Sequence, residues 1–412
     1  MALAGTCRII PAVSFKTDQT LNSSPLWASA FRPFYLLGAL YAPLLVAAWL
    51  GAQLGFWQLP GDAVPLKLQH GHEFIFGFAA AIITGIVLTA LPSWAGTEEI
   101  RGGRLALLVA LWLAGRIGVW VAPWLPTQLP ALVDCLLFPV VFGMLAPQLL
   151  RAQNRLYLLL LPILLALFAA NLLYHQGLAS ANPTQATLAL RLAIHAIIVL
   201  YVLKGGVLAP IFTGNALREK GRGQQVPFDM KLETACLAAV LLLAGCDLGA
   251  APAAWTGGAA LACALLLSWR TLRWQGWRVA DVPLLLVMHL GFLWLVIAFA
   301  LKAAAELTGI VPEATWLHAF TVGSLGMMML GLMTRVSLRH TGRPLVVPRT
   351  MLLAYALMFV AALLRLAAGV HDLGNAVIGV SALLWAASFV LYLACFGRAL
   401  VAPSLPRAAP GP

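Results

Sequence analysis

Apolar stretches of about 20 residues, the length that an α-helix needs to cross a bilayer, recur along the whole chain. Short polar segments separate them. The twelve predicted spans lie at about 31–56, 72–94, 104–124, 129–150, 155–178, 186–212, 232–249, 253–270, 281–307, 314–337, 349–370 and 374–397. No polar segment is long enough to form a soluble domain. The pattern therefore predicts an all-α fold, a polytopic integral membrane helix bundle.

The longest polar segment, at 213–231, lies near the centre of the chain. It divides the single predicted membrane domain into two six-helix halves, at about 29–212 and 232–400, joined by a cytoplasmic loop. No convincing internal sequence repeat accompanies this division. Residues 1–25 lack the continuous apolar core of a secretory signal, so we expect a short polar leader on the cytoplasmic side.

Composition and charge support a membrane protein. The residues are 62% hydrophobic and only 10% charged, which excludes an ordinary soluble enzyme and a disordered chain. The net charge of +12 would suggest nucleic acid on a soluble protein. Here, with the N-terminus inside, 20 of the 26 Lys and Arg residues fall in cytoplasmic segments, and only Lys67 and Lys302 fall in outer ones. Both termini are therefore predicted to be cytoplasmic, with membrane lipid and not nucleic acid as the partner.

The histidines are unevenly distributed across this topology. Six of the eight fall in the predicted outer half of the membrane: His70, His72, His175, His195, His318 and His371. Ionisable residues inside a bilayer are costly, which makes them functional candidates. Imidazole suits haem iron and copper, and such sites are built between the helices of bundles. We therefore expect a metal or haem role for His70, His72, His195 and His318.

Two alternatives remain for these histidines. His70 and His72 are about 200° apart on a regular helix, so they would serve two neighbouring centres, or one would lie in the loop before the helix. The whole set could instead be hydrogen-bonded core histidines. His175 and His371, at helix ends, have the simpler interpretation of interfacial or capping residues.

Four basic residues fall within predicted spans: Arg116, Arg191, Lys204 and Arg365. Each needs a partner, because an unpaired charge in lipid is expensive. The available carboxylates are Glu73, Asp134, Glu233 and Glu306, or those of a bound cofactor. Arginine would serve haem propionates well, since guanidinium pairs bidentately with carboxylate. The alternative is a set of ion pairs that only orient helices.

Three segments resemble the NnrS family: SAFRPFYLLGALYA at 29–42, HGHEFIFGFAAAIITGIVLTALPSWAG at 70–96 and HAFTVGSLGMMMLGLMTRVSLRHTGRP at 318–344. Similarity in hydropathy runs through the whole chain. The family's histidines correspond here to His70, His72, His195, His289, His318 and His340. Phe74 stands where relatives often have methionine, which removes a candidate thioether ligand. Leu338 and Arg339 also depart from the family pattern before the last histidine.

The resemblance implies a multi-pass protein of the bacterial inner membrane that contains non-covalent haem b and copper. It also implies a role in nitric oxide metabolism and resistance to nitrosative stress, commonly alongside denitrification. None of the six cysteines lies in a CxxCH motif, which argues against covalent haem. The expected cofactor-binding residues are His70, His72, His195, His318, His289, His340, Arg116, Arg191 and Arg365, with the first four as metal ligands.

Three functions remain open at this stage. The first is a haem and copper protein that protects the cell by binding nitric oxide or by sparing cellular iron from it. The second is a redox enzyme that converts nitric oxide, with a quinol or a partner cytochrome as electron donor, since the sequence has no iron–sulfur or flavin motif. The third is a secondary transporter, suggested by twelve spans and buried charges. The sequence does not decide whether the protein is an enzyme.

Overall fold

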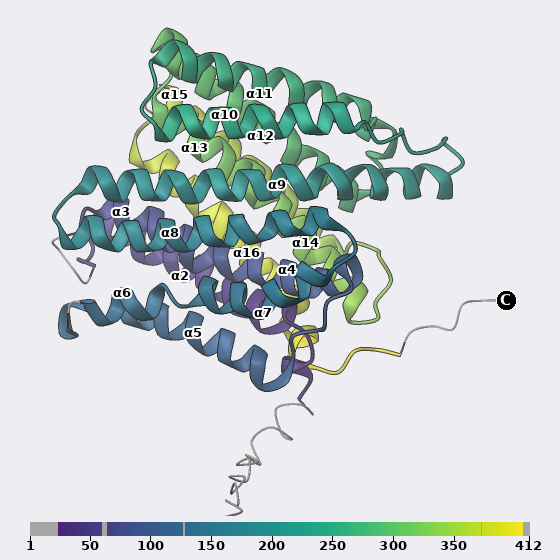
Figure 1. Cartoon of the computed structure of the whole chain (residues 1–412), viewed down its shortest axis with the longest axis horizontal. Coiled ribbons are helices and arrows are strands. Elements are labelled where there is room, and N and C mark those ends of the chain that lie inside the picture. Colours follow the sequence, from purple (N-terminus) through teal and green to yellow (C-terminus); the bar gives the residue numbers. More distant parts are fainter. Residues whose placement is uncertain (1–23, 60–63, 127, 372, 407–412) are drawn as a thin grey trace, which may run out of the picture.

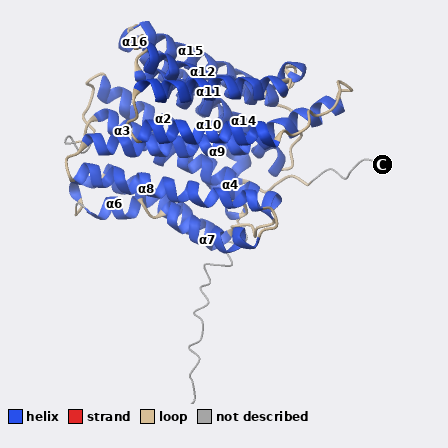
Figure 2. Ribbon diagram, turned by 45° about the horizontal axis from the view of Figure 1, so that its top comes forward, coloured by secondary structure: helices blue, strands red, loops and turns tan. Residues whose placement is uncertain are grey.

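The computed structural model describes residues 24–59, 64–126, 128–371 and 373–406. All regular structure within these residues is helical, and the long helices pack side by side in one bundle (Figure 1; Figure 2). Most of the predicted N-terminal leader lies outside the described residues. The prediction of a polytopic helical bundle is confirmed.

Each predicted span is helical in the structure. The helices are α2 (Phe31–Gln53), α3 (Leu66–His72) with η2 (Glu73–Ala79) and α4 (Ala80–Ala95), α5 (Gly102–Trp120), α6 (Gln128–Asp134), α7 (Leu137–Arg151), η4 (Arg155–Leu159) with α8 (Leu160–Ala179), α9 (Pro183–Glu219), α10 (Met230–Leu248), α11 (Ala253–Arg273), α12 (Pro283–Thr308), α13 (Glu313–His318) with η6 (Ala319–Leu325) and α14 (Gly326–His340), α15 (Arg349–His371) and α16 (Gly374–Val401). Short 3₁₀ turns are η1 (Pro25–Trp27), η3 (Ala122–Trp124) and η5 (Gly276–Val279).

Within the described residues, ten of these helical segments are long and apolar enough to cross a membrane. The other two predicted spans, α10 and α11, carry charged side chains that pair inside the bundle. Arg270 of α11, for example, lies 3.1 Å from the Glu233 carboxylate of α10. α10 packs against α9 and α11, and α11 packs against α10 and α12 (Figure 1).

Two helix boundaries differ from the sequence prediction. The loop predicted at 213–231 is shorter, because α9 continues to Glu219. Its last turns are held by buried residues, and the Thr213 hydroxyl lies 2.9 Å from His289 Nε2. The span predicted at 129–150 breaks between α6 and α7, where Pro139 has no N–H to continue the helical ladder. The break leaves Asp134 at a helix end.

Two central spans contain π-helical turns, η2 and η6, which hydropathy does not reveal. Such turns are rare and often occur at functional sites. They start directly after His72 and His318, and they occupy the same seven positions of a shared pattern, H-x-F-x2-G-x7-G, at 72–85 and 318–331. The two spans therefore share a short motif that coincides with their π-helical turns.

The first glycine of the shared pattern lets an aromatic ring approach each π-helix. A Cβ atom added to Gly77 would lie 2.5 Å from the Tyr41 ring, and one added to Gly323 would lie 2.5 Å from the Trp294 ring. Neither separation is sterically allowed for a larger residue. The two segments are thus alike in backbone, in sequence and in packing.

At the predicted cytoplasmic side, the FRPF and HTGRP motifs hold the end of α16. Arg32 is one of the 20 basic residues that the sequence assigns to the cytoplasmic side, and its side chain is buried. It donates hydrogen bonds to the carbonyls of Ala399, Leu400 and Ala402 and to the Ser404 hydroxyl. The Leu405 amide donates to the Thr341 carbonyl over 2.9 Å. These motifs therefore fasten the C-terminal segment to the bundle.

Candidate functional site

The histidines and charges predicted for the outer half form three groups. The Asp134 network contains Tyr41, His72, Glu73, Arg116, Asp134, Asn171 and His175. The Asp247 network contains Arg191, His195, Asp247, Lys302, Glu306 and Glu313. The His70–His318 pair contains His70, His318 and Arg365.

Asp134 is the centre of the first network. Its Oδ2 atom lies 3.1 Å from His72 Nε2 and 2.8 Å from His175 Nε2. Arg116 contacts the other oxygen of Asp134 and places Nη1 2.6 Å from Glu73 Oε1. The Glu73 carboxylate in turn lies 2.9 Å from His72 Nδ1, so both nitrogens of this imidazole face a carboxylate.

The break between α6 and α7 and the packing of α8 create this arrangement. Asp134 lies at the C-terminal end of α6, and Asn171 and His175 lie one turn apart on α8. The Asn171 amide donates to Asp134 Oδ2 over 3.0 Å, which fixes the carboxylate. The Tyr174 ring stacks on His72, with centroids 4.2 Å apart and planes 19° apart. The imidazole is thus held between a tyrosine ring and carboxylates.

The buried charges of the Asp134 network do not balance. The side chains of Glu73, Arg116 and Asp134 are 6%, 5% and 1% exposed, so two carboxylates share one guanidinium away from water. A buried unpaired charge is costly and calls for a compensating cation or proton. One donor atom each from His72, Asp134 and His175 lies within 4.8 Å of the others. Two imidazoles and one carboxylate suit copper, zinc or iron(II).

The Asp247 network joins four helices around one lysine. Asp247 Oδ2 lies 2.9 Å from His195 Nε2, and its Oδ1 lies 2.6 Å from Lys302 Nζ. The sequence counts Lys302 among the outer charges, but it lies inside α12 and its side chain is completely buried. Its ammonium also lies 2.8 Å from Glu306.

Charges inside the Asp247 network balance. Lys302 and Asp247, 0% and 3% exposed, form a matched pair, whereas Glu306 and Glu313 are 23% and 43% exposed. Arg191 reaches the Glu313 carboxylate over 2.5 Å. The carboxylates of Asp247, Glu306 and Glu313 lie close enough to hold an ion, but the Lys302 ammonium already lies among them. This geometry is typical of an ion-pair network that joins helices.

The third group brings together the two histidines next to the π-helical spans. The rings of His70 and His318 are 6.5 Å apart between centroids, with planes 27° apart. His70 Nδ1 is buried and has no hydrogen-bond partner within the described residues. Arg365 Nη2 lies 3.1 Å from His318 Nε2. Within the part of the chain that the structure describes, Arg365 forms no ion pair with a carboxylate.

The donors of the His70–His318 pair suit copper or haem iron, and Arg365 offers a cation for an anionic group such as a propionate. The space next to His70 is smaller than a haem would need. The cavity next to His70 has a volume of about 20 Å³ and is bordered by Trp49 and Phe74. That volume accommodates a water molecule or an ion but not a porphyrin. His318 does not border this cavity, which lies on the side of His70 that faces Trp49 and Phe74.

The remaining candidates lie elsewhere. His289, near the predicted cytoplasmic side, bonds to Thr213, and its ring is 6.3 Å from that of Trp274. The His340 ring lies 5.6 Å from that of Phe31. Neither histidine is part of the three outer groups. The structure thus separates His70 from His72 and places His195 in the Asp247 network.

Sequence reasoning missed Asp247, gave His175 only an interfacial or capping role, and placed Arg270, which lies outside the three groups, at the cytoplasmic side. Asp247 is an acidic residue near the end of an apolar helix, and its place in the hydropathy pattern could have indicated a buried carboxylate that needs a partner. His175 follows Asn171 by four residues on α8, and this spacing indicates a shared face. Arg270, predicted to be cytoplasmic, is 1% exposed.

Comparison with known proteins identifies the family. The family model described as NnrS protein matches residues 25–404, nearly the whole described chain. A search among curated proteins found no match. The match covers all three groups and every helix. The chain therefore belongs to the NnrS family, and this membership, together with its apolar helices, makes it a multi-pass membrane protein of the nitric oxide response.

Proposed function

We propose that this protein binds copper and haem b in the bacterial inner membrane and protects the cell during nitric oxide exposure, without high catalytic turnover. The observation that carries the proposal is the buried negative excess of the Asp134 network, where two imidazole nitrogens face one carboxylate oxygen. The separations of 3.1 and 2.8 Å are hydrogen-bond distances, and they hold both imidazole nitrogens close enough to this oxygen for the three groups to bind one ion. Copper is the ion that the family resemblance favours.

The chain's own residues prepare this site for a cation. Arg116 and Asn171 hold the Asp134 carboxylate from two sides, and Glu73 accepts from His72 Nδ1, which turns Nε2 of His72 toward the oxygens of Asp134 and Asn171. Such outer contacts orient metal ligands and increase their basicity. The Tyr174 ring covers His72 and excludes water from it. A bound copper or haem iron supplies the open coordination position at which nitric oxide binds.

For haem b, we propose the His70–His318 pair as the binding residues. Two imidazoles and one arginine without a carboxylate partner suit a haem with propionates. Because the cavity at His70 is small, the proposal requires Trp49 or Phe74 to take another position in the loaded protein. Redox enzyme activity is the alternative function, and the experiment below separates it from protection.

The test is metal and haem analysis of the purified full chain, followed by nitric oxide assays. We expect copper by elemental analysis and a b-type haem spectrum whose pigment is extracted by acid–acetone, because nothing attaches it covalently. A fully loaded but colourless and copper-free preparation would refute cofactor binding. Proteoliposomes supplied with reduced quinol should then bind nitric oxide stoichiometrically. Sustained consumption of nitric oxide would instead show that the protein is a redox enzyme.

A further inference from the structure

Of the four basic residues predicted within spans, Lys204 alone belongs to none of the three groups. Lys204 of α9 is half-buried, and its Nζ lies 4.0 Å from the centre of the Tyr157 ring and 5.3 Å from that of Trp94. The two rings lie nearly parallel, 17° apart, with centroids 6.5 Å apart. Ring faces attract an ammonium but do not neutralise it. Among the described residues, no carboxylate lies within ion-pair distance of Lys204.

Lys204 lines a deep groove. The groove has a volume of about 480 Å³ and runs between α8, α9 and the start of α10. Most of its lining is aliphatic, with polar side chains from Ser93, Asn154 and Thr234. Glu233 lies along the same groove, but Arg270 pairs with it over 3.1 Å. The free charge of the groove is therefore positive.

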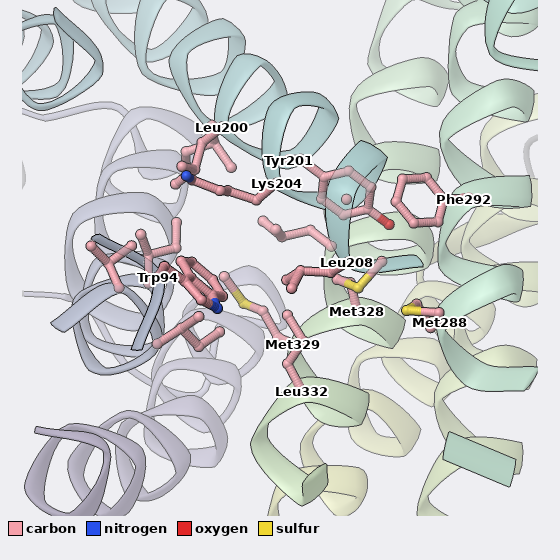
Figure 3. Close-up of a pocket in the computed structure, with 16 residues that line it drawn as sticks. Trp94, Leu200, Tyr201, Lys204, Leu208, Met288, Phe292, Met328, Met329 and Leu332 are labelled. Carbon is pink, nitrogen blue, oxygen red and sulfur yellow. The ribbon is translucent and has the colours of Figure 1, made fainter. Parts of the chain in front are cut away.

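An apolar cavity between α4, α9, α12 and α14 lies next to the groove (Figure 3). Trp94, Leu200, Lys204 and Leu208 border both spaces. Figure 3 shows the Lys204 amine and the Trp94 ring on one side of the cavity, with Met328 and Met329 facing it from α14. A ligand with a charged head at Lys204 could thus extend an apolar tail along a mostly apolar lining, in which Tyr201 contributes a hydroxyl group.

The depth of Lys204 matches that of lipid headgroups. Trp94 ends α4 and Tyr157 starts the α8 segment, both at the predicted cytoplasmic side. Trp and Tyr are enriched at this level of a membrane, where anionic headgroups attract lysines. A free phosphate ion would match the ammonium but leave the long apolar lining without a ligand.

We propose that this groove binds one anionic phospholipid of the cytoplasmic leaflet, with its phosphate on Lys204 and its acyl chains along the groove and the adjacent apolar cavity. The site is independent of the proposed metal function. It explains why a lysine without a carboxylate partner is placed on two aromatic rings next to the largest of the described cavities.

Native mass spectrometry of the full chain in detergent tests this site. Added phosphatidylglycerol should give one retained lipid per chain, and phosphatidylcholine should be retained about fivefold less, the value of one headgroup charge on one lysine. Lys204→Met should lower phosphatidylglycerol retention to the phosphatidylcholine level, and Lys204→Arg should preserve it. Lys231→Met, an exposed lysine near the same membrane edge that does not line the groove, is the matched control.

Two outcomes would overturn the proposal. The first is equal retention of both lipids by the wild type. The second is unchanged phosphatidylglycerol retention in Lys204→Met together with an unchanged thermal unfolding temperature. A third arm adds inorganic phosphate alone: if it displaces the lipid at low millimolar concentration, the site recognises phosphate and not lipid.

Discussion

The Asp134 and Asp247 networks contain the same kinds of groups and differ in which charges are buried. Each places a histidine Nε2 about 3 Å from a central aspartate. Around Asp247, the one fully buried cation, Lys302, matches the one fully buried carboxylate, and the additional glutamates reach the surface. Around Asp134, two buried carboxylates share Arg116. The first arrangement is complete as an ion pair, and the second needs a further positive charge.

This difference separates a structural role from a binding role. A buried, matched pair contributes to the folded state mainly because removal of one partner leaves the other without compensation. A buried excess of negative charge is instead unfavourable until a cation or proton neutralises it. The same Asp→Asn change should therefore reduce stability in one network and reduce metal binding in the other.

The largest effect on stability should come from Asp247→Asn. The change removes the closest carboxylate of the Lys302 ammonium, which is 0% exposed, and leaves Glu306 at 2.8 Å as its partner. The loss of one buried partner costs about 1–3 kcal/mol. Thermal unfolding in detergent should show a clearly lower midpoint, while copper content per folded chain stays at the wild-type value. A loss of copper in correctly folded Asp247→Asn would remove the distinction between the two networks.

Next in size is the loss of copper when histidines of the Asp134 network are replaced. His72→Ala and His175→Ala each remove one of two imidazole ligands, so we expect at least about a tenfold loss in copper affinity, judged from the effect of ligand and outer-contact mutations. Elemental analysis after dialysis against a chelator measures it. His195→Ala is the control, since its imidazole faces Asp247 and should leave copper unchanged.

A third prediction concerns the His70–His318 pair, which lies outside both networks. His318→Ala and Arg365→Met should lower the haem absorbance per chain, whereas His289→Ala, on the opposite side of the membrane, should not. The expected order is a larger loss for the histidine, a direct ligand, than for the arginine, which reaches only peripheral carboxylates. Equal haem in all three variants would place haem at another site.

The smallest effect should come from an exposed cluster with the same chemistry. Asp281, in the loop before α12, lies 2.6 Å from Arg222 and 2.7 Å from Lys220. The hydrogen bond from Arg222, with that from Lys220, holds the pKa of Asp281 well below its usual value. Its contribution is therefore present above the unfolded-state pKa near 4 and is lost as the pH falls further. Asp281→Asn should leave the unfolding midpoint at pH 7 nearly unchanged, because exposed pairs are screened by solvent.

The sequence of this protein predicts the positions of its helices but not the partners of its buried charges. Apolar length located all twelve helical segments, and the one-sided distribution of Lys and Arg placed the candidate histidines at one side, because both signals depend on transfer from water to lipid. Partner choice depends on packing instead. Nothing in the linear pattern joins Asp134 to His175, or Lys302 to Asp247, across helices more than 40 residues apart.

Helix continuation accounts for the other differences. Lys302 and Arg270 lie near predicted span ends, where lysine and arginine are normally solvated, but both remain inside their helices and turn toward buried carboxylates. The π-helical turns after His72 and His318 change the hydrogen-bond register without a change in hydropathy. The shared H-x-F-x2-G-x7-G pattern was the available signal for them.

Copper per chain in the matched pair Asp134→Asn and Asp247→Asn tests the account most directly. Asp134→Asn leaves Arg116 balanced by Glu73 alone and removes both the carboxylate ligand and the buried excess of negative charge. We predict that Asp134→Asn folds and loses its copper, whereas folded Asp247→Asn retains it. Full copper in Asp134→Asn, or equal copper loss in both variants, would contradict the assignment of the metal to the Asp134 network.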